Sequence, residues 1–199
     1  NLTIDGSYSG ATTEEQGLRM WGGAVAYVEN LTITNNQKYG LTMWLSDIET
    51  QGNVILTGNG LAINVGNGAA FASGANINIS GSTDRAISVS QGLFHQWDDG
   101  SITITNTTSG KAFYANQSNI NSYGLTATGD SSTAENLMVL DSSVSNLKNL
   151  SLSNSGKNGL QLNNSESYID NLTSNNNKGD GISASRSRIT VKDSVISGN

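Results

Sequence analysis

One short segment of the sequence carries the residue types that could do chemistry on a carbohydrate. It contains His95, Trp97 and the neighbouring aspartates Asp98 and Asp99. An indole ring can stack on the apolar face of a sugar while carboxylates accept hydrogen bonds from its hydroxyl groups. Two carboxylates are also what glycoside hydrolysis requires. The segment therefore predicts ligand contact, with catalysis by Asp98, Asp99 and His95 and a plain solvated turn as the alternatives.

Trp21 and Trp44 form a second candidate binding site. Each directly follows a methionine, Met20 or Met43, and the two pairs are separated by one repeat of the pattern described below. In a structure that repeats with this period they would stack as a pair on the outer surface near a turn. Two neighbouring exposed indoles suit a glycan or an apolar side chain of a partner. The alternative is that they serve only local packing.

Composition excludes several other chemistries. The 199 residues include no cysteine and one histidine, which excludes disulfides, thiol nucleophiles, zinc fingers and multi-histidine metal sites. A net charge of −6 leaves no basic patch for nucleic acid or for an anionic membrane surface. No apolar run approaches the roughly 20 residues of a membrane span. We therefore expect no metal, no cofactor, no nucleic-acid partner and no direct membrane insertion of this segment.

The elements that must position these residues follow from an internal repeat. A motif of the form small polar, aliphatic, polar, apolar returns along the chain, as in residues 1–4, 30–33 and 101–104. Its aliphatic residue stands at positions 2, 31, 54, 77, 102, 125, 150, 172 and 195. The first interval, from position 2 to position 31, is the longest, and the later intervals are nearly equal. Such regularity is typical of a solenoid.

Within each repeat the apolar residues alternate, which is the period of a strand. A second strand follows the first, usually after a glycine, and a third, weaker strand follows that. Three short strands in about 23 residues make one coil, with coils stacked in parallel about 4.8 Å apart. The sequence predicts an all-β fold, a right-handed parallel β-helix of about nine coils. The right hand is expected because crossover connections between parallel strands are almost always right-handed.

The polar composition fits this architecture, because only every second residue of a strand needs to be apolar. We expect the glycines to serve turns that need a positive φ. Asparagine recurs after the expected second strand at Asn64, Asn116 and Asn163, which predicts a ladder of stacked amides. The absence of proline fits a chain whose backbone N–H groups are in ladders.

Three longer repeats predict loops that project from the rod, where function is often located. The long first interval, between positions 2 and 31, places an insertion at residues 8–16. Two slightly longer intervals, from position 77 to 102 and from position 125 to 150, contain the 94–100 segment and the 129–135 segment. The first insertion could cover Trp21 and Trp44 as a lid. A tolerated insertion without a role is the alternative for each.

The repeat extends from the first residue to the last, so residues 1–199 are expected to form a single β-helix domain. Both ends fall within the pattern, and open ends would expose unpaired strands. We interpret the chain as a fragment of a longer solenoid, or as one whose ends are covered by partners.

The repeat pattern resembles the right-handed parallel β-helix proteins of the pectate-lyase-like superfamily. The resemblance covers essentially the whole chain and is carried best by Asn171-Leu172-Thr173, Gly179-Asp180-Gly181-Ile182 and the run from Ser187 to Ser194. Within that superfamily the chain is most similar to the passenger domain of a bacterial autotransporter, with the β-helices of phage tailspikes and tail fibres second.

The resemblance does not extend to a catalytic motif. Asp98-Asp99 resembles the paired aspartates of polygalacturonase-type glycosidases, but the Gly-His-Gly motif of that family is absent, and Arg188-Ile189-Thr190 lacks its lysine. Adjacent strand residues point to opposite faces, so both carboxylates could serve one site only on a turn. No cluster of acids at coil spacing is present to hold the calcium of a pectate lyase.

The resemblance implies a protein of the bacterial cell surface that binds host glycan or glycoprotein, or copies of itself. A polysaccharide-degrading β-helix and a receptor-binding protein of a virion tail are the alternatives. Trp21, Trp44, His95, Trp97, Asp98 and Asp99 are the candidate ligand-binding residues. We expect binding rather than catalysis, because fold does not determine function and no catalytic constellation is evident.

Overall fold

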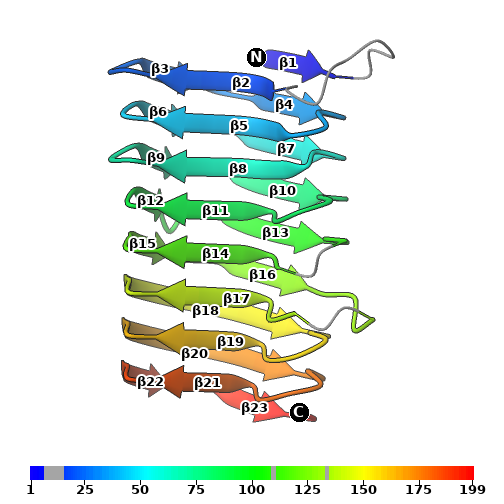
Figure 1. The fold of residues 1–199 in the computed structure, drawn as a ribbon, viewed down its shortest axis with the longest axis vertical. Helices are drawn as coiled ribbons and strands as arrows, with labels where there is room; N and C mark the ends of the chain where they lie inside the picture. The colour runs from blue at the N-terminus through cyan, green and yellow to red at the C-terminus, as the bar shows by residue number, and fades with distance from the viewer. Residues whose placement is uncertain (7–15, 109–110, 133–134) are drawn as a thin grey trace.

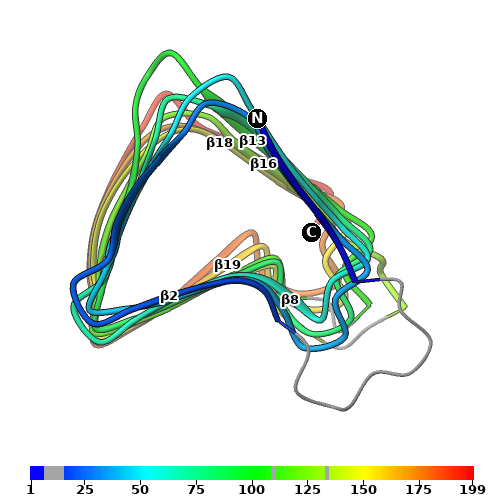
Figure 2. The same cartoon turned by 90° about the horizontal axis from the view of Figure 1, so that it is seen from above.

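The chain winds into a stack of coils whose sides are three parallel β-faces (Figure 1). The computed structural model describes residues 1–6, 16–108, 111–132 and 135–199. Seen along the stack, the coils superpose as a triangle with one side bowed inward (Figure 2). The predicted all-β parallel β-helix, with three short strands per coil, is confirmed.

Along the chain, each coil contributes one strand to each of three faces, which we call the first, second and third face in that order. The first face is built from β1 (Leu2–Asp5), β4 (Leu31–Thr34), β7 (Asn53–Thr57), β10 (Asn76–Ser80), β13 (Ser101–Thr105), β16 (Leu125–Thr128), the carboxyl halves of β18 (Val144–Ser153) and β20 (Glu166–Asn175), and β23 (Val195–Ser197).

The second face, which bows inward, forms an eight-stranded sheet of its own. Its strands are β2 (Gln16–Trp21), β5 (Tyr39–Trp44), β8 (Leu61–Gly66), β11 (Ile87–Ser90), β14 (Phe113–Asn116), β17 (Met138–Asp141), β19 (Leu160–Asn163) and β21 (Ile182–Ser185).

The third face is built from β3 (Val25–Val28), β6 (Asp47–Thr50), β9 (Ala70–Ser73), β12 (Leu93–Gln96), β15 (Asn119–Ser122), the amino halves of β18 and β20, and β22 (Arg188–Lys192). Because β18 and β20 continue around a corner, the first and third faces are hydrogen-bonded into one sheet.

The helix is right-handed. In Figure 1 the chain descends from the N-terminus, the second-face strands in front point left, and the first-face strands behind them point right. The described residues make about eight turns rather than nine. The reason is that the nine occurrences of the sequence motif mark nine first-face strands, which bound eight intervals.

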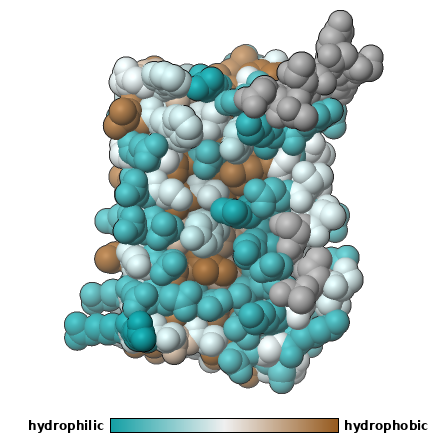
Figure 3. Space-filling model, in the orientation of Figure 1, coloured by the Kyte–Doolittle hydropathy of each residue, from teal (hydrophilic) through white to brown (hydrophobic). Residues whose placement is uncertain are grey.

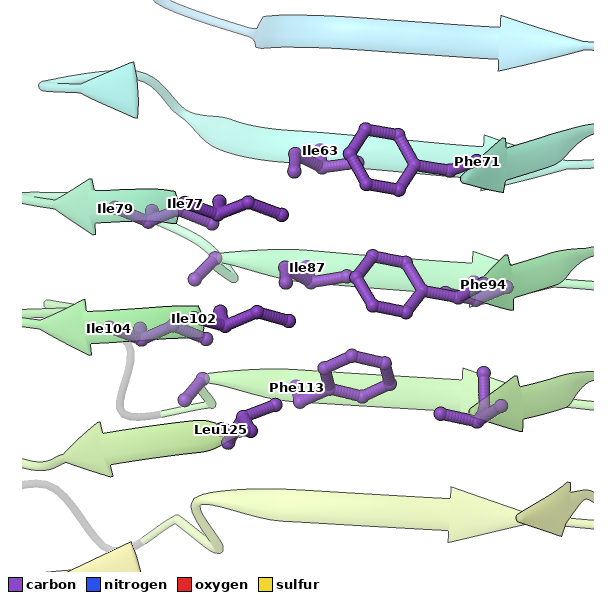
Figure 4. Packing of buried hydrophobic residues seen from close by; sticks show 14 of the residues in the cluster. Ile63, Phe71, Ile77, Ile79, Ile87, Phe94, Ile102, Ile104, Phe113 and Leu125 are labelled. Atoms are coloured by element: carbon purple, nitrogen blue, oxygen red, sulfur yellow. The ribbon is translucent and has the colours of Figure 1, made fainter. Parts of the chain in front are cut away.

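The core is a set of apolar columns that run along the axis. On the first face, Ile77 pairs with Ile102, and both side chains are fully buried. On the third face, the rings of Phe71 and Phe94 stack at 5.1 Å, and Phe94 meets Phe113 edge-on at 5.4 Å (Figure 4). Every second strand residue points into this core, which explains how 35% hydrophobic residues suffice.

Some glycines adopt the positive φ that a turn needs, but those at the start of the second-face strands do not. Gly58 and Gly81 do have a positive φ, at a corner where other coils place asparagine. Gly40, by contrast, lies inside β5 without a positive φ, and a Cβ there would lie 2.7 Å from the carbonyl oxygen of Ala62. The expectation that turn conformation explains the glycines is therefore wrong for Gly40, where close approach of the backbone is the reason.

The buried asparagine ladder also lies elsewhere than expected. Asn36 donates from its backbone N and from Nδ2 to Oδ1 of Asn59, at 3.1 and 3.0 Å, just after the first strands. The predicted positions lie inside the second strands and do not form one column of amides. Asn116 and Asn163 share a column but are separated by Asp141, and Asn64 lies in another column, in register with Thr42. The sequence pattern did not distinguish an amide facing inward from one facing outward.

Candidate functional site

The two tryptophans lie side by side where the second face meets the third. Trp21 ends β2 and Trp44 ends β5, and the two are in register. Their ring centroids are 6.5 Å apart with a tilt of 33°. Met20 and Met43 point inward, so the next residue of each strand points outward, and the indoles are 61% and 44% exposed. The spacing thus predicted the pairing, and we call these residues the tryptophan pair.

A glycine in the following coil makes room for the pair. Gly66 is the register partner of Trp44, and a Cβ on Gly66 would lie 2.9 Å from Nε1 of Trp44. The Trp44 ring therefore rests on the backbone of β8, in the space that a side chain would occupy. The site descends across three coils in this way, from Trp21 to Trp44 to Gly66.

A hollow of about 240 Å³ adjoins the tryptophan pair at the turn, and we call it the turn hollow. Gly22, Leu45 and Asn67 line it together with the two indoles, and all three have a positive φ. Leu45 is 63% exposed. The conformation belongs to the turn, since the equivalent residues of neighbouring coils share it, but a leucine is an uncommon residue in it.

A second hollow of about 190 Å³ lies on the other side of Trp44, along β5, and we call it the β5 groove. Its lining is polar and cationic: Gln16, Arg19, Met20, Lys38, Tyr39, Thr42 and Trp44. The guanidinium carbon of Arg19 lies 4.6 Å from the ring centroid of Trp21, and Nζ of Lys38 lies 5.7 Å from that of Tyr39. Trp44 thus separates an apolar hollow from a cationic one. Figure 3 shows the second face from the front, with hydrophobic patches along its middle among mostly hydrophilic side chains.

The second predicted group, which we call the His95 cluster, comprises His95, Trp97, Asp98 and Asp99. His95 points outward from β12, and its ring meets that of Trp97 edge-on at 5.9 Å. Asp98 and Asp99 are exposed on a turn in which the N–H of Gly100 donates to the carbonyl oxygen of Trp97 at 3.3 Å. The structure therefore meets the requirement that both carboxylates stand on a turn.

The cluster also depends on a glycine one coil away. A Cβ on Gly74 would lie 3.1 Å from Oδ1 of Asp99, 3.1 Å from the ring of Trp97 and 2.7 Å from Oε1 of Gln51. These three side chains converge over the bare backbone of Gly74. Part of the cluster is thus held against the preceding coil.

The structure does not bring the two predicted groups together. The tryptophan pair lies at the corner between the second and third faces, whereas the His95 cluster lies at the corner between the third and first faces. There the connection from β12 to β13 is the loop that projects farthest at the upper corner in Figure 2. The third face separates them, so they are two separate candidate sites.

Other sequence predictions fall partly outside the described residues. Residues 8–15 of the expected lid and residues 133–134 of the 129–135 loop lie there. In that loop, the backbone N–H of Ser132 donates to Oδ1 of Asp130 at 2.9 Å and lowers the pKa of that carboxyl. The described part of the chain contains no group of three or more His, Asp or Glu side chains that could hold a metal ion.

Sequence reasoning missed three contributors to the tryptophan site: Arg19, Leu45 and Gly66. Arg19 stands two residues before Trp21, a separation that puts both on one face of a strand. Leu45 occupies the repeat position where neighbouring coils carry Gly22 and Asn67, so aligning the repeats would have marked it. Gly66 is found only through the strand register.

Comparison with protein-family models, with curated proteins and with solved structures gave no match. Among the described residues, no helix is long and apolar enough to cross a membrane.

Proposed function

We propose that this protein is a carbohydrate-binding β-helix, and that the tryptophan pair is its binding surface. The observation that supports the proposal is the pairing of two exposed indoles, 6.5 Å apart and in register, beside the turn hollow. Exposed aromatic surface of this kind is costly in water and is typical of binding sites. Indole faces stack on the apolar faces of sugar rings, while nearby polar groups bind the hydroxyls.

The setting we propose is the surface of a bacterium, where the chain would act as an adhesin for host glycan or glycoprotein, or for copies of itself. The parallel β-helix and the resemblance to autotransporter passengers within the pectate-lyase-like superfamily support this setting. A regular rod also offers many weak contacts along one face, and avidity then replaces a deep pocket. A virion tail protein that binds a receptor would use the same surface chemistry.

The test is a glycan-array screen of the protein beside the double variant Trp21→Ala/Trp44→Ala. We expect the wild type to bind a set of glycans and the double variant to lose at least about tenfold in affinity, because stacking on each aromatic ring contributes on the order of 1 kcal/mol. Tyr27→Ala is the matched control, since Tyr27 is an exposed aromatic residue on the third face. Equal loss in the control, or full binding by the double variant, would contradict the proposal.

Cleavage of a polysaccharide at the His95 cluster is the second candidate function. The observation that favours it is that Asp98 and Asp99 are both exposed on one turn beside Trp97. If this function is correct, glycan depolymerisation by the wild type is abolished in Asp98→Ala/Asp99→Ala while the unfolding transition is unchanged. Binding without any released product would instead leave the tryptophan pair as the functional surface.

A further inference from the structure

Several basic residues lie on or beside the second face in the upper coils, and they are not equivalent. Two of them have an acidic neighbour: Arg85 lies 3.5 Å from Asp84, and Lys111 lies 3.3 Å from Glu135. Arg85 also stacks over Tyr114, with its guanidinium carbon 5.0 Å from the ring centroid. Their charges are therefore largely balanced within the fold.

Arg19 differs, because no carboxylate of the described chain lies within ion-pair distance of it. Its contact is with the face of Trp21, at 4.6 Å. Stacking occupies the flat side of a guanidinium and leaves the in-plane N–H donors directed outward. Arg19 is exposed, so these donors are available to a ligand in the β5 groove.

The β5 groove is cationic in a protein that is acidic as a whole. The chain has a net charge of −6, yet the described residues that line the groove include no aspartate or glutamate. In the same coils, acidic residues such as Asp47 and Glu49 lie on the third face. Among the described residues that line these two hollows, the charges are thus separated by face, and the positive side coincides with the tryptophan pair.

We propose that the β5 groove selects sugars that carry a carboxylate, with Arg19 binding the carboxylate while Trp44 stacks on the sugar ring. A guanidinium fork matches the two oxygens of a carboxylate, and this match distinguishes an acidic sugar from a neutral one. Sialic and uronic acids share this chemistry. The inference rests on the proposed function, since it names the ligand class of the same surface.

The test measures affinity for three defined probes, 3′-sialyllactose, trigalacturonate and lactose, by titration calorimetry with the wild-type protein and with Arg19→Met. We expect the wild type to bind at least one acidic probe about ten times more tightly than lactose, in line with a hydrogen-bonded charge pair. Arg19→Met should remove this preference, so that the variant binds the acidic probes no more tightly than it binds lactose. The preference should also weaken as salt is raised, whereas lactose binding should not.

Two further variants separate the alternatives. Arg85→Met is the matched control, because it removes an arginine of the same face that also stacks on an aromatic ring but already has an acidic neighbour; it should leave all three affinities unchanged. Trp44→Ala should weaken binding of every probe. A preference for acidic probes that survives in Arg19→Met, or equal affinity of the wild type for all three probes, overturns the inference alone. No binding of either acidic probe also overturns the inference, whereas the proposed function is overturned only if the glycan array shows no binding by the wild type.

Discussion

Leu45 shows at the level of one residue how the proposed binding surface differs from the neighbouring coils. The first residue of the turn after each of the upper second-face strands has a positive φ, and neighbouring coils place Gly22 and Asn67 there. Leu45 adopts the same conformation with φ at 48° and exposes its side chain beside Trp44. A left-handed conformation costs an ordinary L-residue about 1–2 kcal/mol. The apolar side chain is kept at a position where the backbone favours asparagine.

Replacing Leu45 by asparagine should therefore raise stability and lower binding. Asparagine tolerates the left-handed region, so we expect Leu45→Asn to increase the free energy of unfolding by about 0.5–1 kcal/mol. The same change removes apolar surface from the turn hollow, so glycan affinity should fall. Chemical denaturation and the glycan titration measure the two effects.

Gln91→Asn provides the control for Leu45→Asn. Gln91 occupies the same turn two coils further along, with φ at 54°, and it is not part of the turn hollow. We expect a smaller gain in stability, because the change also removes the hydrogen bond that Nε2 of Gln91 donates to Oε1 of Gln117 at 3.1 Å, and no change in binding. If Leu45→Asn destabilises the protein while Gln91→Asn stabilises it, packing of the leucine outweighs backbone strain.

The strands and turns of one coil are held to the next by polar as well as apolar columns. Asn59 shows this best, because its Oδ1 accepts from two nitrogen atoms of Asn36 and its Nδ2 donates to the carbonyl oxygen of Ile33 at 2.9 Å. The Asn59 side chain is fully buried, so these groups have no access to water. The same arrangement returns in the last coils, where Asn177 donates to Oδ1 of Asn199.

Replacing Asn59 by alanine should lower the free energy of unfolding more than the loss of a polar side chain usually does. Asn59→Ala removes the acceptor of the Asn36 backbone N–H and one of the two acceptors of its Nδ2, the other being the carbonyl oxygen of Thr34, and it removes a donor to the carbonyl of Ile33. We expect a loss of about 2–4 kcal/mol in the free energy of unfolding. Asn78→Ala is the control, because Asn78 points outward from the first face and is exposed. Urea denaturation of the two variants should differ by at least about 1.5 kcal/mol; similar losses would show that the ladder does not stabilise the stack.

At the scale of the whole molecule, the sequence period predicted the architecture because it reports the register directly. Leu31, Val54 and Ile77 are register partners, as their even spacing along the sequence implies. The period could not show that the backbones of neighbouring coils approach closely at Gly40, nor could it locate the corners. Those corners place the tryptophan pair and the His95 cluster on either side of the third face. Whether a side chain points into the core or outward depends on the backbone conformation at single residues, and the period of the sequence does not report that conformation.

The common direction of the strand pairs has a mechanical consequence. The hydrogen bonds between coils run along the axis of the rod, since neighbouring strands are stacked in that direction. A tensile load applied between the two ends acts on one ladder of bonds at a time, so coils peel off in succession rather than shearing together. Each coil of about 23 residues releases on the order of 75 Å of chain when extended. A rod anchored at one end and attached to a ligand through its side would therefore yield stepwise and dissipate a pull before the binding contact breaks.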